Sequence, residues 1–360
     1  MDKNFLQWAN ENQSRLLVPN ALLEPRHSHE GIGAAVAVRG CLYFEKAYDA
    51  EVREALAQCF DDYCAVAGDK LTFLWHNGKA AQAFNKAKPM RDLASKLGEN
   101  DRFDFDYMSG ESASDAGFWG FHVFGMRGWE QKMGTRGVDV LDFSFPMVAV
   151  QEDPDAFAGL FFRFAQRLKA LRGHAGFAVN LSPTAQAENE STEFWVSQIM
   201  PGLDVGYPAA NPERDMRDKI KSVDWLTTIS KDMLDRVGGV SKLRSELPPA
   251  WFAFGDYGAG VVIRAGVLPD GGLSESEDKP PVLPPAYVVL DAALRPIRAS
   301  EMEILQRGTV NGDAPVYNTK ASTAAWLRRF ETDENGLLAA KAALLDTPSL
   351  EPSNALPNPL

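Results

Sequence analysis

The stretch that decides the class of fold is the alternating run Arg102-Phe103-Asp104-Phe105-Asp106-Tyr107-Met108. Side chains alternate between the two faces of a strand, so the aromatic residues share one face and the two aspartates share the other. Such a half-exposed strand is typical of an antiparallel sheet, whereas strands of a parallel sheet are buried on both faces. We therefore expect an α+β fold, in which a mixed, largely antiparallel sheet is flanked by helices.

Similar patterns extend outward from this strand in both directions. Apolar or alternating runs predict further strands at residues 33–44, 71–75, 117–128, 138–145 and 175–181. Apolar residues at helical spacing predict helices at residues 49–65, 89–97, 154–171 and 191–200. A strand–helix–strand order thus occurs twice, at Gly33–Trp75 and Val138–Leu181, which suggests two similar halves.

The last third of the chain has a different pattern. Helices are predicted at Trp225–Val237, where Gly238-Gly239 forms a stop, at Val240–Leu247 and at Thr323–Phe330. A hairpin is predicted from Trp251–Phe254 and Gly260–Ala265, and a further strand at Ala286–Leu294. We divide the chain into an N-terminal segment (1–26), one α+β domain (27–346, with a sub-boundary near 135–150) and a disordered tail rich in Pro, Ser and Asn (347–360).

Charge and composition restrict the classes of function. The 360 residues include 37 Lys and Arg against 49 Asp and Glu, which gives a net charge of −12. This charge repels phosphate backbones and favours a basic partner, so we expect no nucleic-acid binding. The N-terminus has no signal-peptide pattern, and no apolar run is long enough to span a membrane, so a cytoplasmic protein without a membrane partner is expected. Three cysteines, Cys41, Cys59 and Cys64, form no disulfide framework.

Familiar catalytic motifs are missing from the sequence, including the phosphate-binding G-x-x-x-x-G-K-[ST], G-x-S-x-G and H-E-x-x-H. His27 and His29 have a spacing that can chelate a metal, but no further ligand is near them in the sequence. His122 lies within a predicted strand, where a buried histidine with a polar partner is the ordinary explanation. His174 is expected in a turn between a helix and a strand.

The carboxylates offer a sharper candidate. Asp104 and Asp106 project from one strand face with Cβ atoms about 7 Å apart, and Glu111 and Asp115 follow closely. Such a group could hold a divalent cation, act as acid and base in glycoside cleavage, or bind a basic partner. The ordinary explanation is that the charges mark the solvent-exposed face of a strand.

Three further acidic runs occur. Two of them precede or begin predicted helices, where negative charge complements the helix dipole: Glu152–Asp155, and the group Glu188, Glu190 and Glu193. The third run lies in the long loop Leu268–Pro285, where no helix explains it; its members are Glu275, Glu277 and Asp278.

A set of structural motifs resembles one known family. The motifs are Val223-Asp224-Trp225-Leu226-Thr227, Arg236-Val237-Gly238-Gly239, Arg264-Ala265-Gly266, Pro285-Ala286-Tyr287-Val288 and Ala325-Trp326-Leu327-Arg328-Arg329-Phe330. With the upstream elements, they resemble the type VI secretion immunity family, formerly catalogued as an uncharacterised domain, over residues 25–335. Proteins of that family bind antibacterial toxins encoded beside them, several with nuclease-like domains.

The resemblance implies a non-enzymatic immunity protein that neutralises a cognate secreted toxin, without a cofactor or a metal. An adaptor that loads the toxin for secretion is the second hypothesis, and it would leave the toxin active. A metal-dependent hydrolase built on Asp104, Asp106, His27 and His29 is the third. We expect the partner-binding residues among the acids outside helix starts: Asp104, Asp106, Glu111, Asp115, Glu275, Glu277 and Asp278.

Overall fold

Eleven described strands form one sheet. They are, in chain order, β1 (Leu17–Pro19), β2 (Ile32–Phe44), β3 (Phe73–His76), β4 (Gln82–Ala83), β5 (Phe103–Met108), β6 (Gly120–Gly125), β7 (Asp139–Phe145), β8 (Arg172–Leu181), β9 (Leu226–Ser230), β10 (Phe252–Asp256) and β11 (Gly260–Ala265). Across the sheet the order is β10-β11-β9-β8-β2-β7-β6-β5-β3-β4, and β1 pairs with β2. Each of these pairings is antiparallel, which confirms the expected α+β fold.

The structure, a computed structural model, describes residues 17–19, 31–134, 137–272, 281–308 and 316–360. Its helices are α2 (Ala50–Ala67), α3 (Met90–Ala94), α4 (Gly128–Lys132), α5 (Met147–Glu152), α6 (Pro154–Leu168), α7 (Gln186–Ile199), α8 (Asn211–Arg214), α9 (Lys231–Arg236), α10 (Gly239–Glu246), α11 (Pro285–Leu294), α12 (Lys320–Leu327) and α13 (Glu334–Ala343). None of these described helices is both long enough and apolar enough to cross a membrane.

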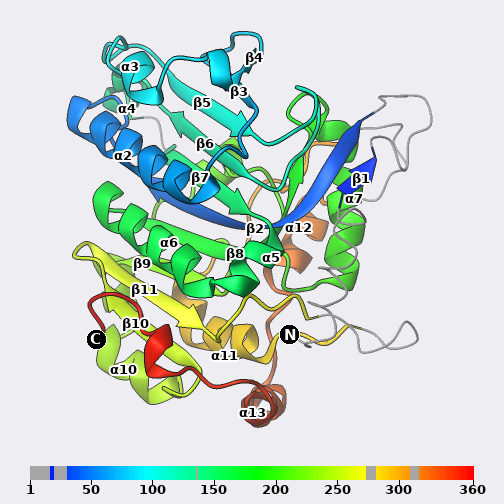
Figure 1. The fold of residues 1–360 in the computed structure, drawn as a ribbon. Helices are drawn as coiled ribbons and strands as arrows, with labels where there is room; N and C mark the ends of the chain where they lie inside the picture. Colours follow the sequence, from blue (N-terminus) through cyan, green and yellow to red (C-terminus); the bar gives the residue numbers. More distant parts are fainter. Residues whose placement is uncertain (1–16, 20–30, 135–136, 273–280, 309–315) are drawn as a thin grey trace.

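Helices cover both faces of the sheet (Figure 1). α2, α5 and α6 lie against one face, and α7 and α12 lie behind the other. α6 shows how the sequence dictates this packing, because the Asp153 side chain caps its first turn by accepting a hydrogen bond from the Ala156 N–H at 2.9 Å. The apolar face of α6, with Phe157, Phe161 and Phe164 fully buried, then packs on the central strands.

The two expected strand–helix–strand halves share this single sheet. β2 precedes the expected sub-boundary near 135–150, β7 lies within it and β8 follows it, and β2 pairs with both β7 and β8. The domain boundaries themselves stay a prediction.

Two predicted elements in the last third are wrong. The segment predicted as one helix at Trp225–Val237 forms β9 followed by α9, since Thr227, Thr228 and Ile229 are β-branched residues that favour a strand. The strand predicted at Ala286–Leu294 is the helix α11. It begins with Pro285 at its first position and is buried on nearly all sides, and a fully buried helix shows the same continuous apolar run as a buried strand. The hairpin of β10 and β11 is confirmed.

The C-terminal tail, predicted to be disordered, instead packs against β10. The Leu360 N–H donates to the Phe254 carbonyl at 3.1 Å, and the Asp256 N–H donates to the Asn358 carbonyl at 3.0 Å. Leu356 is only 2% exposed. The polar composition of the tail concealed these backbone bonds and the one buried leucine.

Candidate functional site

β5 carries Asp104 and Asp106 as the alternation predicts. Phe103, Phe105 and Tyr107 are fully buried, whereas the two aspartates on the opposite face of the strand are partly exposed. Neither carboxylate forms an ion pair or a hydrogen bond with any residue that the structure describes. Two unpaired carboxylates therefore lie side by side on one strand.

Polar side chains continue from Asp106 in a row across five strands. Asp106 of β5 lies opposite His122 of β6, and His122 lies opposite Asp142 of β7. Asp142 lies opposite Cys41 of β2, and Cys41 lies opposite His174 of β8. Cross-strand partners point to the same side of a sheet, so these five residues define one face, which we call the polar face.

His122 and Asp142 form a pair at the centre of this face, in which His122 is buried and Asp142 is partly exposed. Their Nδ1 and Oδ2 atoms are 2.7 Å apart. Burial lowers the pKa of His122, but the charge and hydrogen bond of Asp142 outweigh burial and raise that pKa to about 9. The Tyr207 hydroxyl lies 3.4 Å from the other ring nitrogen of His122, and the two rings stack with centroids 5.7 Å apart. His122 thus has the polar partner that we expected from the sequence, namely Asp142.

Asp106 differs from Asp142 because no cation within the described part of the chain forms an ion pair with it. Burial raises the pKa of Asp106 to about 6; His122 opposes this change, and the charges of Asp142 and Asp104 add to it. A small hollow of about 90 Å³ opens beside it, lined by Asp106, His122, Asp142, Arg39 and Tyr207 among others. A basic group from outside would lower the cost of keeping this carboxylate ionised.

The other predicted acids do not join this group. Asp115 is buried and organises its own loop, because its Oδ1 accepts from the Ile32 N–H at 3.0 Å and its Oδ2 from the Ser112 N–H at 2.7 Å. Glu111 is exposed in the same loop. The remaining three lie outside the described residues: Glu275, Glu277 and Asp278. The metal-chelating pair of the hydrolase hypothesis, His27 and His29, lies outside them as well.

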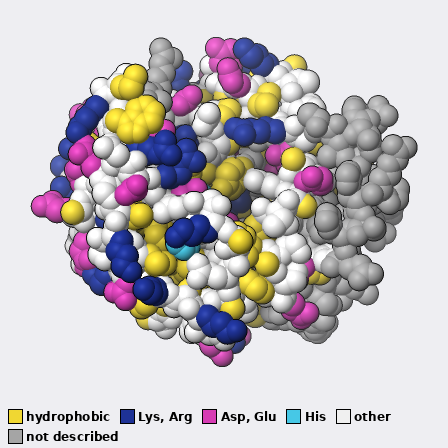
Figure 2. All heavy atoms as spheres, turned by 90° about the horizontal axis from the view of Figure 1, so that it is seen from above, with side chains coloured by type: hydrophobic (Ala, Val, Ile, Leu, Met, Phe, Trp, Pro, Cys, Tyr) yellow, Lys and Arg dark blue, Asp and Glu magenta, His cyan; other side chains and the backbone are white. Residues whose placement is uncertain are grey.

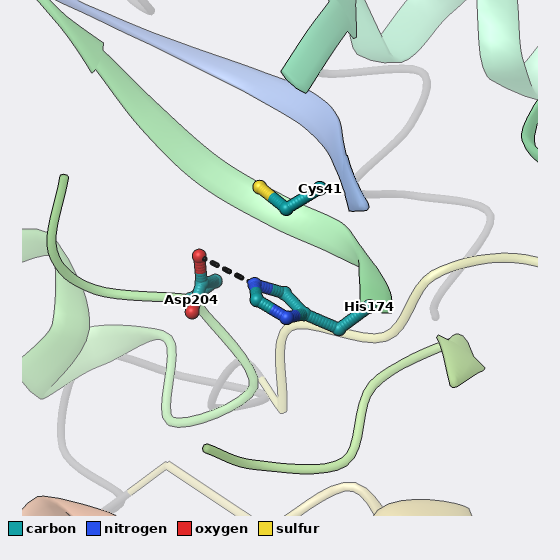
Figure 3. Close-up of side chains that lie close together, drawn as sticks. All are labelled: Cys41, His174 and Asp204. Atoms are coloured by element: carbon teal, nitrogen blue, oxygen red, sulfur yellow. Dashed lines mark ion pairs between the residues drawn. The ribbon is translucent and has the colours of Figure 1, made fainter. Parts of the chain in front are cut away.

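Cys41, His174 and Asp204 come together in the interior (Figure 3). His174 lies within β8, in contrast to the predicted turn, and its Nε2 is 3.1 Å from Asp204 Oδ2. The group resembles a metal-ligand set, but burial raises the pKa of the Cys41 thiol well above its usual range. Asp204 already pairs with Arg39 at 3.1 Å and Lys221 at 2.6 Å. A protonated thiol and a carboxylate paired with two cations do not suit a divalent metal ion.

Lys221 is the centre of a buried charge network that the sequence did not reveal. Its Nζ lies 2.6 Å from Asp204 Oδ1 and 2.7 Å from Glu213 Oε1. Burial raises the pKa of Asp204, but Lys221, His174 and Arg39 outweigh burial and hold that pKa well below its usual range. The Tyr43 hydroxyl donates to the second oxygen of Glu213 at 2.7 Å. These contacts tie β2 and β8 to the segment between α7 and β9.

Glu190 and Glu193 extend the network from α7. The helix-dipole explanation for them is wrong, because both are buried and accept hydrogen bonds from other segments. Glu193 accepts from the Gly206 N–H at 3.2 Å and from Gln306 Nε2 at 2.6 Å, and Glu190 accepts from the Gly308 N–H. Burial raises the pKa of each carboxyl to about 7. Their spacing of three residues, which places both on one face of α7, was the only signal in the sequence.

The surface charge is mixed on the face seen in Figure 2. Lys and Arg side chains lie among Asp and Glu side chains around a central hollow, and no continuous acidic patch is visible on the described part of this face. For example, Arg91 of α3 pairs with both Glu54 and Asp61 of α2. Acids that are already paired attract a basic partner less. Asp104 and Asp106 differ from other acids without an ion pair among the described residues, such as Asp232 and Asp235, because they are only partly exposed.

Comparison with known proteins identifies the family. Residues 55–330 match the TsiV family, which is described as type VI immunity for VRR-NUC. A solved structure, the Pseudomonas aeruginosa T6SS protein PA0821, is similar with a TM-score of 0.89 and 36% sequence identity, and 100% of each chain is covered. No curated protein matches the chain. Since the match spans most of the α+β domain and agrees with the fold of a type VI secretion protein, this chain belongs to the TsiV family of type VI immunity proteins.

Proposed function

We propose that this protein neutralises a VRR-NUC effector of a type VI secretion system by binding it directly, without catalysing a reaction. The observation that carries the proposal is the match of residues 55–330 to the TsiV family. The net charge of −12 supports it, since an effector that acts on nucleic acid needs a positively charged cleft. An acidic protein associates quickly with such a cleft through long-range attraction.

The polar face supplies the contact in this proposal. Asp104 and Asp106 are partly exposed and unpaired among the described residues, and burial has already raised the pKa of Asp106 to about 6. A Lys or Arg of the effector would therefore gain charge-assisted hydrogen bonds at little further desolvation cost. Occlusion of the nucleic-acid cleft is the mechanism that this charge pattern favours.

The decisive experiment co-expresses the protein with the product of the neighbouring gene, which we expect to be a VRR-NUC effector, purifies the complex and measures its nuclease activity. We expect the complex to form, nuclease activity to be lost and growth of the producing cell to be rescued. A stable complex that retains full nuclease activity would instead favour the adaptor hypothesis.

A paired set of variants tests the polar face. Asp104→Lys with Asp106→Lys should slow association with the effector at least tenfold, because two attractive carboxylates become repulsive. The control is Asp232→Lys with Asp235→Lys, which makes the same charge change at exposed positions of α9. α9 follows β9, which four strands separate from β5. Equal association rates for the two double variants would show that the effector binds elsewhere.

A further inference from the structure

A second hollow on the polar face is lined by three arginines. Its volume is about 640 Å³, and Arg102, Arg214 and Arg307 face it together with Phe124, Tyr207 and Asn211. We call it the arginine hollow. Tyr207 lines both this hollow and the smaller one beside Asp106 and His122. A basic hollow in a protein of net charge −12 calls for an explanation.

Two of the guanidinium groups are fixed in place by an aromatic ring. The Cζ atoms of Arg102 and Arg214 lie 5.1 Å and 4.3 Å from the centroid of the Phe124 ring. Arg214 is further held by the Ala209 carbonyl at 3.0 Å and the Val138 carbonyl at 3.2 Å. The cations are therefore held ready before any ligand arrives, which reduces the entropy that binding costs.

None of these three guanidinium groups forms an ion pair with a carboxylate in the part of the chain that the structure describes. Other buried arginines do form one: Arg39 with Asp204 at 3.1 Å, and Arg264 with Asp155 at 2.5 Å. In Arg102, moreover, the Nε atom is buried and has no hydrogen-bond partner among the residues that the structure describes. A buried donor without a partner is costly, and a ligand that accepts its hydrogen bond removes that cost.

Two acidic side chains, Glu130 and Asp215, also line the arginine hollow, and their charges act on Arg214 together with that of Asp139. The Oε2 atom of Glu130 accepts a hydrogen bond from the Arg127 N–H at 2.8 Å, which closes the first turn of α4. Asp215 is exposed after the end of α8. The carboxylates near the hollow thus act on Arg214, whereas Arg102 and Arg307 form no ion pair with a carboxylate of the described residues.

We propose that the arginine hollow binds an acidic segment of the effector, with an Asp or Glu carboxylate bound by the guanidinium groups of Arg102 and Arg307. This inference rests on the proposed function. Guanidinium and carboxylate match in a planar, two-bonded geometry, which gives orientation as well as affinity. A nucleic-acid strand fits less well, because the Phe124 ring is already engaged by two guanidinium groups and the net charge repels phosphates.

The two hollows together specify the pattern of the effector surface. A basic side chain would occupy the position beside Asp106, and an acidic side chain would occupy the arginine hollow on the other side of Tyr207. Adjacent sites of opposite sign reject surfaces of a single charge, so the pair would provide specificity beyond the general attraction between an acidic and a basic protein.

The test uses Arg102→Glu and Arg307→Glu separately, with Arg244→Glu as the matched control. Arg244 is exposed on α10, at the opposite end of the molecule from β5 (Figure 1). Arg214 is not substituted because it donates hydrogen bonds to the Ala209 and Val138 carbonyls, so its loss would also disturb the fold. Binding of the purified effector, measured by calorimetry, should weaken at least tenfold for both hollow variants and less than twofold for Arg244→Glu. A thermal melt verifies that each variant folds, and the exposed Arg307 keeps the test valid if Arg102→Glu does not fold.

The outcomes separate this inference from the proposed function. If wild type and hollow variants all bind and silence the effector equally, the arginine hollow is not a contact, while the proposed function stands. If the wild-type protein does not bind the effector, the proposed function fails and this inference fails with it. A 20-nucleotide single strand serves as the second probe. If it binds the wild-type protein and loses that affinity in the hollow variants, the ligand is a phosphate chain and the acidic-segment assignment is wrong.

Discussion

At the scale of single residues, the molecule separates two uses of charge. Asp204 and Glu213 are buried and paired with Lys221, whereas Asp104 and Asp106 are partly exposed and unpaired among the described residues. An ionised carboxylate is costly to bury unless it is paired within the protein, so these buried pairs have a structural role. A partly exposed carboxylate without a partner is free to recognise another molecule.

The buried network makes Lys221 a sensitive position. Lys221→Met would leave Asp204 and Glu213 without their shared cation, and we expect it to lower the free energy of unfolding by about 3–5 kcal/mol. Chemical denaturation measures this change. Lys219→Met is the control, because Lys219 is exposed and near in sequence. A change below about 1 kcal/mol for Lys221→Met, in the range of an exposed pair, would contradict the importance of the network.

His122 should contribute to stability in a way that depends on pH. Its folded-state pKa of about 9 lies above the ordinary value of 6.5, so the stabilising contribution is fully present below pH 6.5 and is lost as the pH rises through 9. NMR titration of the His122 ring should give this raised pKa. Asp142→Asn should lower it, because the carboxylate is the principal group that raises it. An unchanged pKa in Asp142→Asn would show that another group is responsible.

At the scale of elements, the C-terminal tail closes one end of the sheet. Leu356 is 2% exposed and fills the space beside β10, so Leu356→Ala should lower the free energy of unfolding by about 2–5 kcal/mol. Leu360→Ala serves as the control, since Leu360 is 37% exposed. Equal melting temperatures of the two variants would mean that the tail contributes little to stability.

The elements also show what can be predicted from sequence. β5 was correctly predicted because one of its faces is buried and the other is partly exposed, which leaves a period of two in the sequence. α11 was not, because eight of its ten residues are buried and the period disappears. Each residue of the polar face can be found in the sequence. The row that joins Asp106, His122 and Asp142 cannot, because it depends on the register between strands, which no local sequence pattern encodes.

At the scale of the whole molecule, the net charge of −12 predicts how binding depends on salt. Association with a basic effector should slow at least tenfold between low salt and roughly 0.3 M salt, because ions screen charges that lie farther apart than a few ångströms. Dissociation should change much less, since the close pairs are poorly screened. Stopped-flow measurements at several salt concentrations test this, and an association rate independent of salt would contradict electrostatic steering.

The central position of β2 has a consequence for how soon a new molecule can protect its cell. β2 ends at Phe44, but its neighbours β7 and β8 are not complete until Phe145 and Leu181. At bacterial synthesis rates, on the order of ten seconds separate the emergence of β2 from that of its second neighbour. Until β7 emerges, the pairing partner available to β2 is the short β1, which covers only its first residues. The polar face, which needs β5 to β8, does not exist before β8 is complete. Under the proposed function, a cell that meets the effector during this delay is protected only by molecules finished earlier, which favours a stored surplus of the protein over new synthesis.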